Sequence, residues 1–384
     1  MSAFERQCFV TKIVFVASME KGNQEKESLY NLTYVIPFYN GESTIEVCLN
    51  SIFASGLDEQ ELEVLVIDDC SPVGAESVLK TLCASHPNLR IIRHGYNRRQ
   101  GGAKNTGIRE AKGVYIAFAD QDDEVISANL KVALKRAVQT MSDVVSCRWI
   151  AESEGNDYET GVMLEDGIIM GGVAFCEEVV DPSVSFGPWS YLYKREFLQS
   201  QAHPMAENVL MEDADWIAWH LFFAKSVLYF NRAIYRWHIH HDSLSHSPTS
   251  YTRLAWVKLG LRIVDDSEVY RLTSKRYAEK MYQNGLGDIN RQFEDLWKVK
   301  DCYRFFQLLS NEGLLDRLRV MELSNKTRML IEYPKLTKWS YGIYGIMRRT
   351  FEATKQSMLE NKKAVARTYR RIKSRWVSNN SNRK

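Results

Sequence analysis

Three aspartates directly follow an apolar segment of the chain. Residues 114–119 are apolar or aromatic, and Asp120, Asp122 and Asp123 come next. Alternate side chains of an extended strand share a face, so Asp120 and Asp122 are expected to point the same way. Carboxylate oxygens held together at the end of a strand suit Mg²⁺ or Mn²⁺. The alternative is an acidic loop that caps a helix expected over residues 127–139.

A second acidic motif lies further along the chain. Glu212 and Asp213 precede a segment, 216–223, that is rich in large apolar residues. This segment is expected to be helical, with the carboxylates near its first turn, where the helix dipole favours their ionised form. Adjacent helical side chains diverge by about 100°, so only one of the two can face a substrate. The alternative is an ordinary acidic helix start without a chemical role.

Strand-like and helix-like segments alternate in the first part of the chain. Apolar runs predict strands at 32–36, 62–67, 89–92 and from 114. Helical spacing of apolar residues predicts helices over 43–55, around 78–82 and from 101. The alternation predicts an α/β fold with a helix-covered parallel sheet, whose ligand crevice lies at the carboxyl ends of the strands. Pro37 is expected to end the first strand, because proline has no N–H for the ladder.

Four segments of the chain occur in the order and spacing of a known family. They are residues 35–40, 66–71, 103–107 and 118–123. Their succession resembles the family-2 inverting glycosyltransferases of the GT-A fold, in particular the bacterial members that build surface polysaccharides. The resemblance covers about residues 32–246. It implies a Rossmann-like nucleotide-binding mixed sheet flanked by helices.

The resemblance also implies a nucleotide-sugar donor, with UDP as the expected nucleotide. Pro37 and Tyr39 would line the base pocket, and Asp69 would hydrogen-bond the base. Lys104 stands where the family more often has arginine. Its ammonium would neutralise phosphate charge, although a point charge stacks less well on a base than a planar guanidinium. Asp68 is assigned a structural role, because on a strand it points away from Asp69.

The resemblance assigns the chemistry to the two acidic motifs. Asp120 would approach the ribose or the sugar, and Asp122 would bind the Mn²⁺ or Mg²⁺ that bridges the diphosphate. Asp213 would be the catalytic base that takes the proton of the acceptor hydroxyl, with Glu212 on the acceptor side. Such a single in-line displacement inverts the anomeric configuration. It needs no protonated acid at the leaving group, because a diphosphate leaves as an anion whose charge the cation offsets.

Two further residues are candidates on the acceptor and metal sides. Trp189 lies in a segment, 186–195, that resembles the family's acceptor region. It is placed to stack on a sugar ring, and the alternative is a core residue. Four of the eight histidines fall within 238–246. His238 is a candidate metal ligand, although we favour a polar flap over the donor or a surface loop for this segment.

Composition bounds the class of protein. The chain is 45% hydrophobic and 26% charged, as in an ordinary globular protein. The net charge is +2, yet residues 347–384 carry twelve Lys or Arg against Glu352 and Glu360, a local balance of +10 that leaves −8 elsewhere. This basic segment with interleaved aromatics predicts docking on an anionic membrane surface, as a lipid-linked acceptor would require. The alternatives are a solvated tail and a nucleic-acid arm, and no nucleic-acid partner is expected.

We expect four parts along the chain. They are an N-terminal extension (1–30), a GT-A catalytic domain (31–246), a helical C-terminal region (247–340) and a basic amphipathic tail (341–384). Seven cysteines without a C-x-x-C pair indicate a reducing compartment, and no run reaches the ~20 apolar residues of a membrane span. The expected location is therefore cytoplasmic, peripheral on the inner membrane. The expected acceptor is a glycan or a lipid-linked glycan.

Two other functions stay open at this point. A sugar nucleotidyltransferase also joins an α/β nucleotide-binding sheet to carboxylate-bound metal. It should carry a Gly-rich, basic signature near its first strand, whereas residues 37–41 contain one Gly and no basic residue. A non-enzymatic protein that binds polyanions through its basic tail is the other possibility. Its binding would survive the loss of Asp122 and Asp213.

Overall fold

The computed structural model describes residues 30–72, 75–161, 163–179, 187–239, 249–294, 296 and 302–333. The chain forms two units, one of residues 1–247 and 255–289 and the other of residues 248–254 and 290–384. Each residue that the sequence analysis assigned to the candidate site lies in the first unit. Most of the predicted N-terminal extension and the whole basic tail lie outside the described residues.

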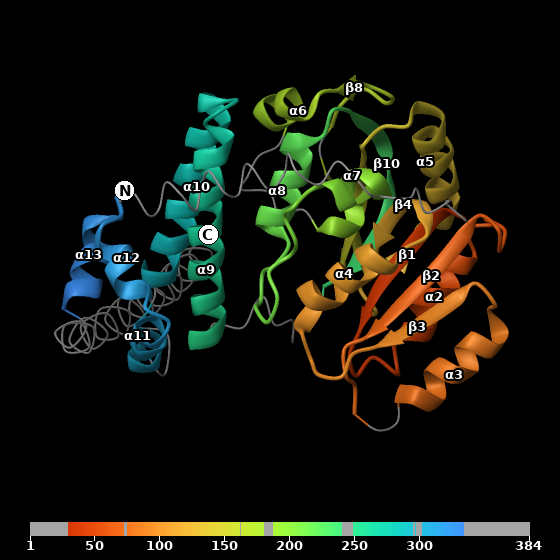
Figure 1. Ribbon diagram of the computed structural model, residues 1–384, viewed down its shortest axis with the longest axis horizontal. Coiled ribbons are helices and arrows are strands. Elements are labelled where there is room, and N and C mark those ends of the chain that lie inside the picture. The colour runs from red at the N-terminus through yellow and green to blue at the C-terminus, as the bar shows by residue number, and fades with distance from the viewer. Residues whose placement is uncertain are drawn as a thin grey trace, which may run out of the picture. The chain divides into compact units, whose positions relative to one another are not determined.

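A mixed β-sheet forms the centre of the first unit (Figure 1). Its described strands are β1 (Tyr30–Phe38), β2 (Leu62–Asp68), β3 (Leu89–Arg93), β4 (Gly113–Phe118), β5 (Glu124–Val125), β6 (Val144–Ser153), β7 (Asn156–Thr160), β8 (Ile169–Met170), β9 (Tyr191–Lys194) and β10 (Val227–His238). They run in the order β3-β2-β1-β4-β9-β6-β10-β5, with β7 paired to β6 and β8 paired to β10. The predicted α/β fold with a mixed sheet is confirmed.

Strands β1 to β4 pair in parallel, and a helix connects each of them to the next, as parallel pairing requires. The antiparallel strand β9 then joins β4 to β6, and β6 is parallel to β10. The strands predicted in this first part of the chain agree with the observed bounds to within two residues. The carboxyl ends of β1, β2 and β4 therefore lie at one edge of the sheet.

Helices cover the two faces of this sheet. The described helices are α2 (Ile45–Phe53), α3 (Ala75–Ser85), α4 (Arg99–Glu110), α5 (Ser127–Thr140), α6 (Gly172–Glu178), the 3₁₀ turn η1 (Pro188–Ser190), α7 (Arg195–Ser200), α8 (Ala214–Phe223), α9 (Ser250–Tyr270), α10 (Lys275–Glu294), α11 (Cys302–Asn311), α12 (Leu314–Arg319) and α13 (Asn325–Glu332). Residues of α2, α3 and α5 share one core, and residues of α4, α6, α7 and α8 share the other. Successive side chains of β1 point to opposite faces of the sheet, so Tyr34 and Ile36 lie in the first core and Val35 lies in the second.

The C-terminal part of the described chain is helical, as predicted from its pattern. Helices α9 to α13 follow one another after residue 249 (Figure 1). Among the described residues, none of the helices has the length and apolar composition that a membrane span requires.

The expectation that Pro37 ends the first strand is wrong. Pro37 lies inside β1 and stands opposite Ile67 of β2. The pairing of β1 with β4 ends at Val35 and Phe118, two residues before the proline. Side-to-side alternation along a strand makes the Pro37 nitrogen face the position beyond the end of β4. The missing N–H therefore removes no bond from either ladder.

Helix α4 packs on β1 through a glycine. A Cβ built on Gly107 would lie 2.1 Å from Cγ1 and 2.9 Å from Cγ2 of Val35. Val35 is fully buried in the core that α4 covers. The helix therefore approaches β1 to a distance that a larger residue would prevent.

We expect Gly107→Ala to lower the free energy of unfolding by about 1–3 kcal/mol, because the added methyl must displace Val35 or α4. The measurement is urea denaturation followed by circular dichroism. Gly95→Ala is the matched control, because no atom lies within 4 Å of its Cβ position and its φ is not positive. Equal stabilities of the two variants would contradict the tight contact.

Candidate functional site

The first acidic motif lies where the chain leaves β4 beside β1. Asp120 is half-buried, Asp122 is exposed and Asp123 is buried. The backbone N–H of Asp123 donates to the carbonyl of Asp120 (3.2 Å), which closes a turn. Asp120 and Asp122 were expected from the sequence to share a face of a strand. This expectation is wrong, because the strand ends at Phe118, before both residues. Asp122 is nevertheless the most exposed carboxylate of the three.

Asp123 anchors the motif to β10, a role that the sequence analysis did not assign. The hydroxyl of Tyr235 donates to Asp123 Oδ2 (2.7 Å), and the backbone N–H of His238 donates to Oδ1 (2.8 Å). The same hydroxyl accepts a hydrogen bond from the backbone N–H of Asp120 (2.9 Å). Burial raises the pKa of Asp123 to about 8, and the nearby charge of Asp120 adds to this rise. The signal in the sequence was an aspartate directly after the expected metal ligand.

Lys104 of α4 joins the two acidic motifs. Its side chain is 1% exposed, and the ammonium lies 3.0 Å from Glu212 Oε1 and 3.9 Å from Asp120 Oδ1. It also donates to the amide oxygen of Gln100 (3.0 Å). Burial alone lowers the pKa of Lys104, but Glu212, Asp120 and Asp213 together raise it above its ordinary value. Lys104 is therefore a charged residue at this site, and its contact with donor phosphate stays a prediction.

Asp213 is the N-cap residue of α8, and its side chain makes no capping hydrogen bond. Its carbonyl accepts from the N–H of Ile217 (2.8 Å). The ion pair in the first turn is made by Asp215, which receives two hydrogen bonds from Arg262 (2.7 and 2.9 Å). Burial, followed by the charge of Glu212, raises the pKa of Asp213 to about 7, and Lys104 opposes this rise. The carboxylate of Asp213 therefore does not serve as an ordinary helix cap.

Tyr39 lies next to the first acidic motif. Its side chain is 45% exposed. Its backbone N–H donates to Gln121 Oε1 (2.9 Å), and its carbonyl accepts from Gln121 Nε2 (3.0 Å). Gly41 makes room for this amide, because a Cβ there would lie 2.3 Å from Gln121. Gln121, which lies between Asp120 and Asp122, thus joins the segment after β1 to the acidic motif.

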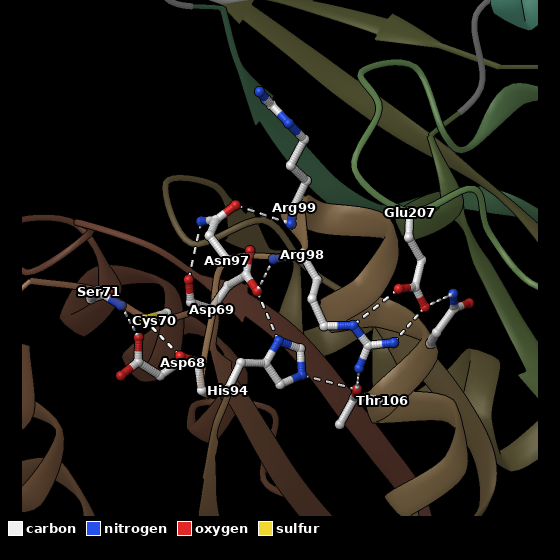
Figure 2. A network of polar contacts seen from close by, with 12 residues as sticks. Asp68, Asp69, Cys70, Ser71, His94, Asn97, Arg98, Arg99, Thr106 and Glu207 are labelled. Atoms are coloured by element: carbon white, nitrogen blue, oxygen red, sulfur yellow. Dashed lines mark hydrogen bonds and ion pairs between the residues drawn. The ribbon is translucent and has the colours of Figure 1, made fainter.

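Asp69 lies at the carboxyl end of β2 and is held in a network of polar contacts (Figure 2). Its Oδ1 accepts from His94 Nδ1 (2.8 Å) and from the backbone N–H of Arg98 (2.8 Å). The other ring nitrogen of His94 lies 3.0 Å from the hydroxyl of Thr106 on α4. The predicted base-binding carboxylate is therefore oriented by the turn that leads into α4.

Asp68 has different partners from Asp69 (Figure 2). It is buried, accepts from the backbone N–H of Ser71 (2.9 Å) and pairs with Arg93. Cys70, which precedes Ser71 in this turn, adopts a left-handed conformation with φ of 64°. These contacts hold the turn that follows β2, in line with the structural role assigned to Asp68.

Trp189 is a residue of the first core. It is 7% exposed and stacks on Tyr235 with ring centroids 4.6 Å apart and planes at 10°. The edge of Trp149 also packs against it. Trp189 thus supports the ring of Tyr235, whose hydroxyl donates to Asp123. Its predicted stacking on an acceptor sugar stays a prediction, with one ring face already covered.

His238 lies between two glutamates at the end of β10. Its Nδ1 is 3.0 Å from Glu152 Oε2, and its Nε2 is 3.0 Å from Glu124 Oε1. The hydrogen bond to His238 lowers the pKa of Glu152. Both ring nitrogens thus have carboxylate partners, and a role of His238 as a metal ligand stays a prediction. Its neighbours in the predicted flap, 240–246, lie outside the described residues.

The fold is GT-A, an architecture shared with the structure of S. aureus TarS bound to UDP-GlcNAc. That comparison has a TM-score of 0.56 and 18% identity, and it covers 81% of this chain and 89% of the TarS fragment. Residues 33–196 match the family model of glycosyl transferase family 2. The chain therefore carries a family 2 glycosyltransferase domain, as the motifs predicted.

The similar proteins include two bacterial proteins that are named glycosyltransferases. EpsJ of Bacillus subtilis, an uncharacterised glycosyltransferase, is 28% identical over 171 residues, which cover 44% of this chain and 49% of EpsJ. The GalNAc(5)-diNAcBac-PP-undecaprenol β-1,3-glucosyltransferase of Campylobacter jejuni is 29% identical over 126 residues, which cover 33% of this chain and 40% of that protein. The chain thus spans half or less of the length of these two relatives.

We expect Tyr235→Phe to lower the free energy of unfolding by about 1–3 kcal/mol, because it leaves Asp123 and the Asp120 N–H buried without this partner. Denaturant unfolding measures the change. Tyr34→Phe is the matched control: Tyr34 is also fully buried, but its hydroxyl has no hydrogen-bond partner in the described part of the chain. An equal loss of unfolding free energy in both variants would show that the hydrogen bond from Tyr235 to Asp123 does not stabilise the fold.

Proposed function

We propose that the protein is a metal-dependent inverting glycosyltransferase. In this proposal it moves a sugar from a nucleotide sugar, a UDP-sugar, to a hydroxyl of a glycan or lipid-linked acceptor in polysaccharide biosynthesis. The observation that carries the proposal is the meeting of the two acidic motifs at Lys104, 3.0 Å from Glu212 and 3.9 Å from Asp120. The family 2 domain over residues 33–196 supports the same class of reaction.

The carboxylates after β4 fit a divalent cation. Hard oxygen ligands suit Mg²⁺ or Mn²⁺, and Asp122 is exposed at the edge where the ligand crevice of such a sheet lies. Burial raises the pKa of Asp120, Lys104 opposes this rise, and the charges of Asp122 and Glu212 add to it. Asp122 would hold the ion, whose chemistry is to offset charge on the departing diphosphate, and Asp120 would lie toward the ribose or the sugar.

Asp213 is proposed as the base that takes the proton of the acceptor hydroxyl. Its carboxylate is not used as a helix cap, and burial raises its pKa to about 7, close to neutral pH, where a sizeable share of the group is deprotonated and a carboxylate accepts a proton more readily than an ordinary aspartate does. Glu212 points to Lys104 and would orient the acceptor side of the loop. Pro37, Tyr39 and Asp69 are proposed for the nucleotide base.

The relatives support the proposed substrates. TarS was solved with UDP-GlcNAc, and the name of the C. jejuni relative specifies a lipid-linked acceptor. We extend the first to a UDP-sugar donor and the second to a lipid-linked glycan acceptor for this protein. The local charge of +10 over residues 347–384 supports docking of that segment on an anionic membrane surface.

The test is donor binding and hydrolysis across UDP-, GDP- and dTDP-sugars with Mn²⁺ or Mg²⁺. We expect one nucleotide to bind only with metal, and we expect Asp122→Ala to abolish that binding. Asp213→Asn should keep binding and lose about 10²–10⁴-fold in turnover. Asp58→Ala is the control for an exposed aspartate outside the site. Absence of binding to every nucleotide sugar would overturn the proposal.

The rate should also depend on pH through Asp213. A base acts only when deprotonated, so kcat/KM should rise with pH and level off above the pKa of Asp213, which burial raises to about 7. A pH–rate profile with saturating metal measures this limb. The residual rate of Asp213→Asn should lack it. A limb with its midpoint near the ordinary aspartate value, about 4, would show that burial does not act on this carboxylate.

A further inference from the structure

Arg98, the N-cap residue of α4, contacts two parts of the candidate site at once. The backbone N–H of Arg98 donates to Asp69 Oδ1 (2.8 Å), on the side of the proposed base pocket. The guanidinium of Arg98 forms a two-bond fork with Glu207, through Nε to Oε2 (3.0 Å) and Nη2 to Oε1 (2.6 Å) (Figure 2). One residue thus reaches from the donor side to the loop of residues 201–213.

Loop 201–213 follows the surface of α4 closely. The side-chain amide of Asn105 donates to the carbonyl of Met205 (2.9 Å) and accepts from its N–H (2.9 Å). The N–H of Asn208 donates to the carbonyl of Arg98 (3.2 Å). A Cβ on Gly101 would lie 2.1 Å from the carbonyl oxygen of Ala206. The path of the loop is therefore set by α4.

This loop ends in the proposed catalytic base. Glu207 precedes Asp213 by six residues, and Glu212 is tied back to α4 by Lys104 (3.0 Å). The segment between these two ties carries no helix or strand of its own. The Arg98–Glu207 fork holds the start of this segment, and Arg262 donates to the carbonyl of Met211 (2.5 Å) near its end.

The fork has the features of a persistent ion pair. Arg98 and Glu207 have side chains 23% and 32% exposed, and Asn105 adds a third hydrogen bond to Glu207 Oε1 (3.2 Å). The hydrogen bond from Arg98 lowers the pKa of Glu207, and the bond to Glu207 raises the pKa of Arg98. A planar guanidinium fixes the direction of a carboxylate as well as its distance.

We propose that Arg98 is a positioning residue for sugar transfer. Its fork on Glu207 holds loop 201–213 so that Asp213 lies at a fixed place relative to the donor, whose base site Arg98 orients through its own backbone. This inference rests on the proposed function. Because the bond to Asp69 comes from the backbone, substitution of the side chain leaves donor binding intact and acts on turnover.

The test compares Arg98→Met, Arg98→Lys and Glu207→Gln with wild type in donor binding and in turnover. We expect unchanged affinity for UDP with Mn²⁺ and a fall in kcat of about 10–100-fold, the effect of a small misplacement of a catalytic group. A lysine side chain keeps the charge without the fork, so Arg98→Lys should recover only part of the rate. Wild-type kcat in Arg98→Met, or a parallel loss of UDP binding, would overturn the inference.

A double substitution shows whether the two side chains act as one unit. Arg98→Met combined with Glu207→Gln should lose no more activity than the single variants, because either change alone breaks the fork. The control is Arg136→Met, which removes the Arg136–Asp166 pair (2.8 Å), with side chains 33% and 34% exposed. It should keep wild-type kcat. Multiplying losses in the double variant would show that the two residues act separately.

A pH profile separates positioning from general destabilisation. A loosened loop admits water to Asp213, so the acidic limb of kcat/KM should move to lower pH in Glu207→Gln, a variant that keeps the shape of the side chain. An unmoved limb together with a lowered melting temperature would overturn the positioning role. An inactive wild type refutes the proposed function itself, whereas an active wild type matched by Arg98→Met refutes only this inference.

Discussion

The site depends on one buried ammonium among several carboxylates. Lys104 lies between Glu212 and Asp120, and Asp213 and Asp122 add negative charge close by. Two like charges 4 Å apart repel by about 4 kcal/mol at the effective dielectric of a protein surface. The buried ammonium offsets this repulsion where the two acidic motifs meet at this edge of the sheet. Removing one partner of a buried pair costs about 3–5 kcal/mol, because the other charge stays uncompensated.

Helix α4 meets this constraint because its successive residues serve different neighbours. Each residue of a helix is rotated by about 100° from the one before it. Lys104 therefore faces the carboxylates, Asn105 the loop before α8, and Thr106 the ring of His94. Gly107 then faces β1 and allows the close approach that brings the other three into reach. One turn of helix thus ties the sheet, the donor side and the catalytic loop together.

The sequence carried the fold and the identity of the acidic motifs, because both depend on local patterns. Apolar periodicity located the strands, the first acidic motif follows the strand that ends at Phe118, and the second precedes a helix that was expected from its apolar residues. The partners of those carboxylates could not be read in the same way. Asp123 and Tyr235 are 112 residues apart, and Arg98 and Glu207 are 109 apart. Which distant segments meet is decided by sheet order, and β9 inserts between β4 and β6 without a local signal.

Two residues show the limit of a local pattern. The sequence around His238 does not specify its neighbours, which are Glu124 on β5 and Glu152 on β6. Pro37 was placed by its missing N–H, but that loss matters only where a partner strand is present. Both questions are settled by pairing across the sheet. A pattern within one segment predicts whether a residue is buried, but it does not predict which residue of a distant segment will be its partner.

The lysine at position 104 follows from the geometry of the site. Its ammonium has three donors and lies near three acceptors, on Gln100, Glu212 and Asp120. A guanidinium is planar and carries five donors, so at a position 1% exposed it would leave N–H groups without acceptors. A compact charge suits a place where one cation must offset carboxylates from two directions. The departure from the family's more frequent arginine is therefore compatible with a residue that holds the two acidic motifs together from inside.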